Sequence, residues 1–231
     1  MMDSQKILIL NGASSVENAP GFVALVHRRK SDISVVDQER VIGRGGAERF
    51  PLIVRYILTK NKLKAEAVTM IAVIIGPGSF TGLRASIALA AGLGMGTGCP
   101  VIGIRRGEAL FPELMEQAKG RDIWHVSLAR RGRVFIEKSS QSKVIASAIE
   151  QLSVPDEPIL MAGESAHLLT ELWGDRPNIE RASLDEADAV MVAKKACQYW
   201  DIGKIGNPLY PLYVDMPEAK KPEIKSKLAS S

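Results

Sequence analysis

Glycines, a proline and hydroxyl side chains are concentrated in one short segment that directly follows the apolar run Val68 to Ile75. An apolar run of this length, rich in Val and Ile, predicts a buried strand, and the uncharged stretch after the segment predicts a helix. In such a strand–loop–helix unit, the backbone N–H groups at the helix start can bind an anion. The segment is not a P-loop, because Leu83 stands where that motif has a lysine. Its residues are Gly76, Pro77, Gly78, Ser79, Phe80, Thr81, Gly82, Leu83 and Arg84.

Three side chains of this glycine-rich loop could cap the helix, bind a charged group or act as a nucleophile. Thr81 is predicted to be the N-cap of the helix, with its hydroxyl accepting a backbone N–H. Arg84 has two interpretations, a contact with a phosphate or a partner's carboxylate, or a surface arginine at the loop. Ser79 has no neighbouring base in the sequence that would activate it as a nucleophile.

Metal and nucleotide chemistry have few candidate residues. The three histidines, His27, His125 and His167, are isolated, with no second histidine four residues on, so the sequence predicts no metal site. Asn11, at the end of the first predicted strand, lacks the negative charge that a hard cation favours, and we interpret it as a turn residue. We therefore expect no cofactor and no ATPase activity of the chain alone, with ATP possible only at an interface shared with partners.

Strands and helices alternate along the chain and predict an α/β protein in which helices cover a partly parallel sheet. The best boundary is Gly120, which divides the chain into 1–120 and a smaller unit of 121–231 with an extended tail from Asn207. The expected strands are 6–10, 22–28, 32–37, 68–75, 101–104, 123–129, 134–138 and 159–162, of which the first three form an antiparallel meander. The expected helices are 47–59, 83–96, 108–119, 142–152, 165–172 and 184–200.

Composition points to the cytoplasm. The two cysteines lack metal-like spacing and fit a reducing compartment, and the polar start, Met1 to Lys6, predicts no signal peptide. The uncharged stretch Ala85 to Ile104 is long enough for a membrane span, but its glycines and Pro100 predict helix, turn and strand instead. A net charge of +4 permits RNA contact without requiring it, and we interpret the lysines from Lys220 to Lys227 as a solvated tail.

The helix after the glycine-rich loop carries a stripe of small residues. Each glycine in a helix interior costs about 1 kcal/mol relative to alanine, so this element needs a compensating contact. Ala85, Ala88, Gly92 and Gly96 recur at steps of three or four residues, which leaves a smooth surface for a close neighbour. The stripe packs either against the chain's own sheet or against a helix of a partner.

The string from Gly76 to Arg84 resembles the TsaB (YeaZ) family, in which a strand ends in GPGSFTG before a small-residue helix. The resemblance extends over nearly the whole chain, including Lys6 to Leu10, Ala47 to Leu58 and the turn at Arg130 and Arg131. It implies an actin-like ATPase (ASKHA) fold of two α/β lobes without catalytic activity of its own. It also implies binding to the catalytic paralogue TsaD, with the ATPase TsaE, in making threonylcarbamoyladenosine on tRNA.

Four positions depart from the family pattern. They are Asn11 in place of an aspartate, Gly46 in place of a histidine, Leu128 in place of an acidic residue, and Asp215 in place of an arginine after Pro211 and Tyr213. They indicate a divergent member whose native partner is less certain than its fold.

We thus expect a non-catalytic scaffold that forms a homodimer when alone and contacts tRNA weakly or indirectly. The interface is expected on the glycine-rich loop and on Ala88, Gly92 and Gly96. The alternatives are a small-molecule kinase or ATPase of the same fold that uses the loop, and a glycoprotease-like peptidase.

Overall fold

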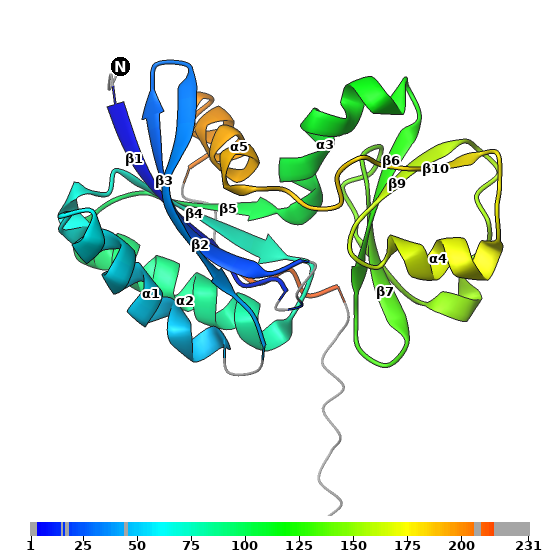
Figure 1. The fold of residues 1–231 in the computed structure, drawn as a ribbon, viewed down its shortest axis with the longest axis horizontal. Helices are drawn as coiled ribbons and strands as arrows, with labels where there is room; N and C mark the ends of the chain where they lie inside the picture. The colour runs from blue at the N-terminus through cyan, green and yellow to red at the C-terminus, as the bar shows by residue number, and fades with distance from the viewer. Residues whose placement is uncertain (1–3, 15, 17–18, 44–45, 206–208, 215–231) are drawn as a thin grey trace, which may run out of the picture.

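Two lobes, each built on one five-stranded sheet, make up the computed structural model (Figure 1). The structure describes residues 4–14, 16, 19–43, 46–205 and 209–214. The predicted tail beyond residue 214, with Asp215 and the lysines from Lys220 to Lys227, lies outside the described residues. No helix in the described ranges is both long enough and apolar enough to cross a membrane.

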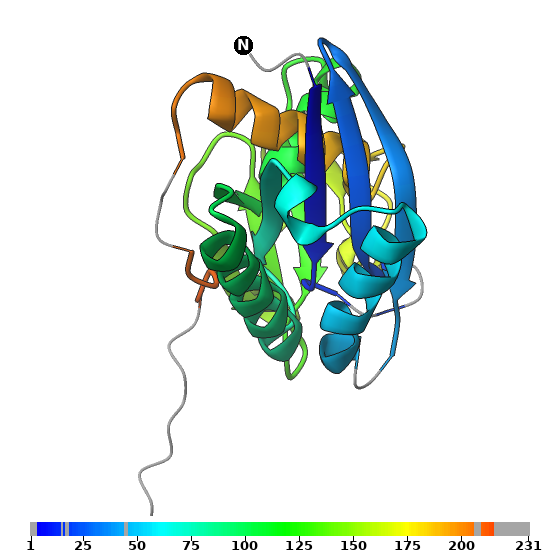
Figure 2. The same cartoon turned by 90° about the vertical axis from the view of Figure 1, so that its left-hand side faces the viewer.

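The first sheet has the order β3-β2-β1-β4-β5 and is covered on both faces. The strands β1 to β3 form the predicted antiparallel meander, and β4 and β5 continue the sheet in parallel from β1. Consecutive residues of β1, from Ile7 to Leu10, are all buried, as expected for a strand with helices on both sides. Helices α1 and α2 lie on one face, and α5 lies on the other (Figures 1 and 2). The elements are β1 (Ser4–Asn11), β2 (Gly21–Arg29), β3 (Asp32–Val41), α1 (Gly46–Lys60), η1 (Ala65–Ala67), β4 (Met70–Gly76), α2 (Phe80–Thr97), β5 (Val101–Arg105) and α5 (Ala189–Asp201).

The second sheet repeats the topology of the first. Its order is β10-β9-β6-β7-β8, with β6, β7 and β8 antiparallel and β9 and β10 continuing in parallel from β6. Helix α4 packs on one face with Trp124 and Val126, and α3 packs on the other face with Ile123 and Leu160. The elements are α3 (Arg106–Ala118), β6 (Asp122–Leu128), β7 (Arg133–Lys138), β8 (Ile145–Ala148), η2 (Ile149–Gln151), β9 (Ile159–Ala162), α4 (Ala166–Trp173) and β10 (Ile179–Arg181).

The two halves exchange their last helices. Helix α3 follows the last strand of the first sheet but covers the second, and α5 follows the second sheet but covers the first. Contacts therefore cross the predicted boundary at Gly120 in both directions. The division into 1–120 and 121–231 stays a prediction.

The predicted helix over 142–152 is wrong. The structure has the edge strand β8 followed by a short 3-10 turn, with Ile145 paired to Ile136 of β7. A short stretch of mixed apolar and small residues fits both the helical period of about 3.6 and the strand period of 2. Here the segment pairs with the edge of β7 and is therefore a strand. The strand β10, with only three residues, was not predicted. The last helix begins at Ala189 rather than Leu184, because Asp188 is its N-cap and accepts the N–H of Met191.

Candidate functional site

The glycine-rich loop is folded onto the turn after β1. The backbone N–H of Ser79 donates to the carbonyl of Ala13 at 2.6 Å. A Cβ at Gly12 would overlap the carbonyl of Gly82, and one at Gly78, where φ is +154°, would overlap the carbonyl of Ala13. Glycine is therefore required at these close approaches, and the two turns form one packed unit.

Ser79, and not Thr81, is the N-cap of α2. Its side chain accepts the N–H of Gly82 at 3.4 Å, and its carbonyl accepts the N–H of Leu83 at 2.9 Å. The prediction for Thr81 was wrong because the helix begins at Phe80, which places residue 81 inside the first turn. With Ser79 N–H bound to Ala13, several N–H groups that could hold a phosphate already have internal acceptors.

Arg84 and the tail meet on Phe80. The Arg84 guanidinium lies 4.5 Å from the centre of the Phe80 ring, and the Tyr213 ring lies 5.9 Å from the same ring. The N–H of Leu212 donates to the carbonyl of Ile75 at 2.8 Å, so the segment before residue 215 packs along the loop. Arg84 is an exposed arginine that makes a cation–π contact with Phe80, and both of its interpretations stay predictions.

Two of the divergent positions have clear structural roles. The Asn11 side chain accepts the N–H of Ala13 at 3.1 Å, which confirms its interpretation as a turn residue. Gly46 begins α1, and a Cβ there would lie 2.7 Å from a methyl group of Val41, so a histidine would require Val41 to move. Leu128 is exposed, and its backbone N–H donates to Glu164.

The small-residue stripe on α2 faces outward. Ala88, Gly92 and Gly96 are exposed, and a Cβ at Gly92 or Gly96 would meet no atom within 4 Å. Gly94 is the exception, because its Cβ would overlap the side chain of Val101. The alternative that the whole stripe packs on the chain's own sheet is therefore wrong. The structure does not bring Ala88, Gly92 and Gly96 together with the glycine-rich loop into one pocket.

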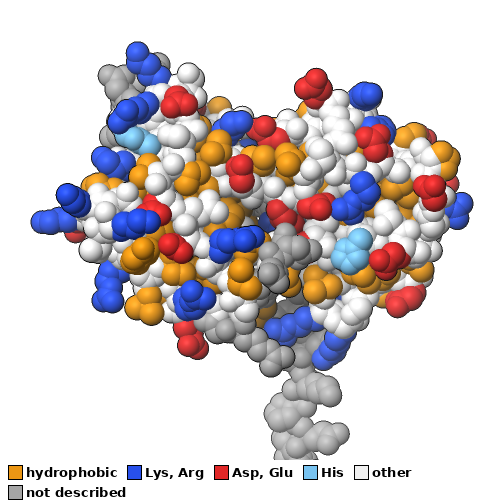
Figure 3. Space-filling model, viewed as in Figure 1, with side chains coloured by type: hydrophobic (Ala, Val, Ile, Leu, Met, Phe, Trp, Pro, Cys, Tyr) orange, Lys and Arg blue, Asp and Glu red, His pale blue; other side chains and the backbone are white. Residues whose placement is uncertain are grey.

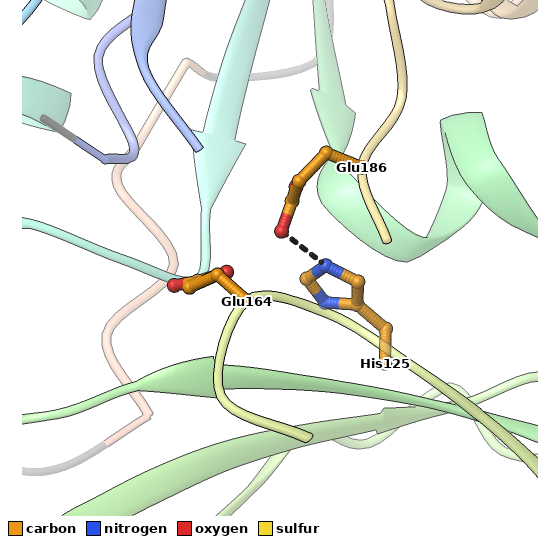
Figure 4. Close-up of side chains that lie close together, drawn as sticks. All are labelled: His125, Glu164 and Glu186. Carbon is orange, nitrogen blue, oxygen red and sulfur yellow. Dashed lines mark hydrogen bonds and ion pairs between the residues drawn. The ribbon is translucent and has the colours of Figure 1, made fainter. Parts of the chain in front are cut away.

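A buried ion cluster that the sequence did not predict lies where the two lobes meet. Its side chains come from α3, from β6 and β7, from the turn after β9 and from the segment between β10 and α5. Figure 4 shows three of them converging, and Figure 3 shows acidic side chains reaching the surface between the lobes. The cluster consists of Arg106, His125, Glu137, Glu164 and Glu186.

Arg106 is the centre of the buried ion cluster. Its guanidinium is 2.5 Å from a carboxylate oxygen of Glu164 and 2.5 Å from one of Glu186, and it donates to the carbonyl of Pro77 at 3.5 Å. Because Arg106 begins α3 at the end of β5, it joins the glycine-rich loop of the first lobe to carboxylates of the second. Burial by itself lowers the pKa of Arg106, but the two carboxylates outweigh it and raise the pKa.

The turn that supplies Glu164 depends on Gly163. This glycine has φ +106°, and a Cβ would overlap the carbonyl of Val126, so only glycine lets β9 end so close to β6. Glu164 then accepts the N–H of Leu128 at 3.1 Å in addition to Arg106. Burial raises the pKa of Glu164, while Arg106 opposes that shift.

His125 and Glu137 face each other across β6 and β7. The His125 Nε2 is 3.1 Å from Glu186, its Nδ1 is 3.9 Å from Glu137, and the whole ring is buried. Burial lowers the pKa of His125, but the charges of Glu186 and Glu137 outweigh burial and raise it. Burial raises the pKa of Glu137, whereas Arg106 and His125 hold the pKa of Glu186 well below its ordinary value despite burial.

The arrangement favours an ion network over a metal centre. Ligand-type atoms of His125, Glu164 and Glu186 lie within 4.8 Å of one another, a spacing that could suit a metal ion. However, Arg106 already contacts both carboxylates and supplies the positive charge that a metal would bring. Arg106 would have to leave before a cation could bind there.

Sequence reasoning missed the cluster because its members are distant in the chain, and the isolated His125 is not isolated in space. Two signals were present. His125 and Glu137 are ionisable residues inside apolar strands, and buried charges need partners. Arg106 directly follows β5, and Glu164 comes two residues after the end of β9.

Comparison with known proteins identifies one family model and several similar proteins. The family model described as TsaD, tRNA N6-adenosine threonylcarbamoyltransferase, matches residues 40–161, just over half of the chain. The transferase of Paracoccus denitrificans is 36% identical over 78 residues, which are 33% of this chain and 22% of that protein. The transferase of Cereibacter sphaeroides is 30% identical over 129 residues, 49% of this chain and 35% of that protein. The chain thus aligns with only about a fifth to a third of these curated transferases.

Other matches extend over most of the chain. An uncharacterized protein of Mycobacterium bovis is 27% identical over 204 residues, 87% of this chain and 90% of that protein. The structure of YeaZ from Pseudomonas aeruginosa superposes with a TM-score of 0.69 at 21% identity, and the match covers 90% of this chain and 99% of that one. This likeness confirms the actin-like fold of two α/β lobes.

Proposed function

The chain belongs to the TsaD (tRNA N6-adenosine threonylcarbamoyltransferase) family, and from that premise we propose that it is a non-catalytic, YeaZ-like subunit in threonylcarbamoylation of tRNA adenosine. In this role it binds a TsaD transferase, together with the ATPase TsaE, and pairs with a second copy of itself when alone. The contact surface is the outer face of α1 and α2.

The observation that carries the proposal is the composition of this α1–α2 face. We define it by three small residues, Ala88, Gly92 and Gly96, and by the apolar side chains Leu52, Tyr56 and Met95, of which Met95 is 87% exposed. Because a Cβ at Gly92 or Gly96 would meet no atom of the described residues within 4 Å, no internal contact requires glycine there to offset its cost of about 1 kcal/mol at each position. A partner helix that approaches the two glycines closely would supply the contacts that offset this cost.

The glycine-rich loop supports a structural role in the same proposal. The N–H groups of Ser79, Gly82 and Leu83 have acceptors within the loop and the turn after β1. The loop therefore fixes the start of α2, which presents the α1–α2 face. A nucleotide-binding role would first have to break these hydrogen bonds.

Gly92→Leu tests the interface. The added side chain projects into open space in the isolated chain but would overpack a close helix–helix contact, at a cost of about 1–3 kcal/mol. We expect a roughly tenfold to hundredfold loss of affinity for the TsaD homologue of the same organism, measured by calorimetry, with unchanged folding. Self-association, followed by size-exclusion chromatography, should weaken in parallel.

Glu171→Leu on α4 is the matched control, because it also adds an exposed leucine to a helix but lies on the other lobe. Binding should survive this change. If Gly92→Leu folds and binds both TsaD and itself as well as the unmodified chain, the proposed face is wrong.

Hydrolysis assays separate the proposal from its rivals. A small-molecule kinase or ATPase would show magnesium-dependent ATP turnover that changes in the 76–84 loop abolish, and a glycoprotease-like enzyme would cleave peptides. We expect neither rate to exceed a blank for the purified chain. Robust turnover in either assay would replace the subunit role with an enzymatic one.

A further inference from the structure

The buried ion cluster is the charged contact that holds the two lobes together at their centre. Arg106 begins α3 directly after β5 and donates to the carbonyl of Pro77 in the first lobe at 3.5 Å, while Glu164, Glu186, Glu137 and His125 all belong to the second half of the chain. A change in the charge of one member therefore acts on the junction between the lobes rather than on a single element.

Every charged group that faces His125 can be named. Glu186 approaches from the segment before α5 at 3.1 Å, and Glu137 approaches from β7 at 3.9 Å. Arg106 on α3 and Glu164 after β9 complete the surroundings of the ring. Arg105, at the end of β5, lies 3.9 Å from the other oxygen of Glu137.

The buried ion cluster is rich in carboxylates. Arg106 contacts Glu164 and Glu186, and Arg105 is shared between Glu137 at 3.9 Å and Glu108 at 2.9 Å, so a protonated His125 supplies a third positive charge next to Glu137 and Glu186. A neutral imidazole has one ring nitrogen without a proton, and each nitrogen faces a carboxylate. Loss of either proton would therefore set a lone pair against a carboxylate and remove one positive charge from a buried site that is rich in carboxylates.

Two of the buried side-chain atoms that lack a hydrogen-bond partner in the described part of the chain belong to His125 and Glu137, at Nδ1 and Oε1; the others are on Ser127 and Arg181. His125 and Glu137 are paired directly across β6 and β7, and the carboxylate oxygen that faces Nδ1 is Oε2, at 3.9 Å. A proton on Nδ1 gives this pair an attractive contact that a neutral ring could not provide.

We propose that the buried ion cluster is a proton-dependent latch between the lobes, closed while His125 carries protons on both ring nitrogens and locally opened when one proton is lost to solvent. This inference goes beyond the proposed function and does not depend on it.

Two backbone amides report on the latch. The N–H of Gly107 donates to Glu137 at 2.8 Å, and the N–H of Leu128 donates to Glu164 at 3.1 Å. Their hydrogen exchange, corrected for the intrinsic effect of pH, measures local opening. Amides of the β1–β2 ladder, such as those of Val23 and Leu25, serve as the reference.

We expect protection of Gly107 and Leu128 to fall as pH rises above about 6.5, by up to about tenfold per pH unit until the buried imidazole has titrated. Protection of the reference amides should change less. In His125→Asn, the pH dependence at Gly107 and Leu128 should disappear. In Glu137→Gln, which retains an acceptor for Gly107, the fall should end at a lower pH and be smaller in total, because the ring has lost one of the negative neighbours that raise its pKa.

The protonation state can also be observed directly in the unmodified chain, which has three histidines. Nitrogen-15 spectra of the buried ring at pH 7 should show two protonated nitrogens. A neutral tautomer at that pH would overturn the proposal whether or not the variants fold. Protection of both amides that stays constant from about pH 6 to pH 9 would overturn the proposal as well.

Discussion

At the residue scale, the stability of the junction depends on one cation between two carboxylates. Removal of one partner from a buried ion pair is more damaging than loss of the pair as a whole, because the remaining charge has neither water nor a counter-ion. Arg106 is almost fully buried and contacts both Glu164 and Glu186, so no other residue can take over its role without a rearrangement.

Arg106→Gln should therefore lower the free energy of unfolding by about 3–5 kcal/mol. Lys194→Gln is the control, because its partner Glu113 is solvent-accessible and such a pair contributes less than about 1 kcal/mol. Urea denaturation followed by circular dichroism would measure both variants. Similar losses for the two would mean that the cluster contributes no more than a surface ion pair.

The loss of unfolding free energy at acid pH should depend on Glu186. Its pKa lies well below the ordinary value of 4.5, so its charged form contributes stability above that pH and loses it as pH falls through the lower, folded-state pKa. The difference in unfolding free energy between the unmodified chain and Glu186→Gln should be largest near neutral pH and shrink in acid. A difference that stays constant from neutral pH into strong acid would contradict this assignment.

The residues of the loop could be predicted from the sequence, whereas those of the cluster could not. The string from Gly76 to Arg84 is contiguous and its close packing on the first turn needs only local chain geometry. The cluster is assembled from five separate elements, and its members become neighbours only after both sheets have formed. The placement of His125 and Glu137 inside apolar strands indicated that they needed partners but not which partners.

At the scale of elements, α2 contains glycines of two kinds. Gly94 faces the sheet, where Val101 leaves no room for a Cβ, while Gly92 faces solvent. The sequence shows the glycines at alternate positions but does not show which of them face the sheet. Elsewhere, long elements with regularly spaced apolar residues matched their predictions. The error at 142–152 arose in a short segment, which forms a strand because it pairs with β7.

Gly92→Ala and Gly94→Ala should have opposite effects on the melting temperature of the isolated chain. At the exposed position, alanine gains up to about 1 kcal/mol of helix propensity. At Gly94 the new methyl group overlaps Val101, and overpacking of this kind costs about 1–3 kcal/mol. Calorimetry of the two variants provides the measurement, and a stabilised Gly94→Ala would show that α2 can move away from β5.

At the scale of the whole molecule, each sheet is completed by a helix from the other half of the chain. The face of the first sheet opposite α1 and α2 is covered by α5, whose buried side chains include Val192, Ala196 and Cys197. Without α5, the apolar residues on that face would be exposed to water.

A fragment of residues 1–120 should therefore fail to fold alone, although it contains all strands of the first sheet. Its amide spectrum should show little dispersion, and addition of the fragment 121–231 should restore it. The full chain should unfold in one transition by both circular dichroism and tryptophan fluorescence. A folded 1–120 fragment would show that α5 is dispensable for the first lobe.

The repeated strand order places two equivalent turns at the junction between the lobes. In both halves the fourth strand is followed by a glycine with positive φ and a serine N-cap that leads into a helix, at Gly78 and Ser79 in one half and at Gly163 and Ser165 in the other. Arg106 contacts both of these equivalent turns, at the carbonyl of Pro77 and at the carboxylate of Glu164. The two halves thus present different chemistry to the same cation from equivalent positions. One turn offers a neutral backbone carbonyl and the other a carboxylate, so a junction built from two similar turns is polar.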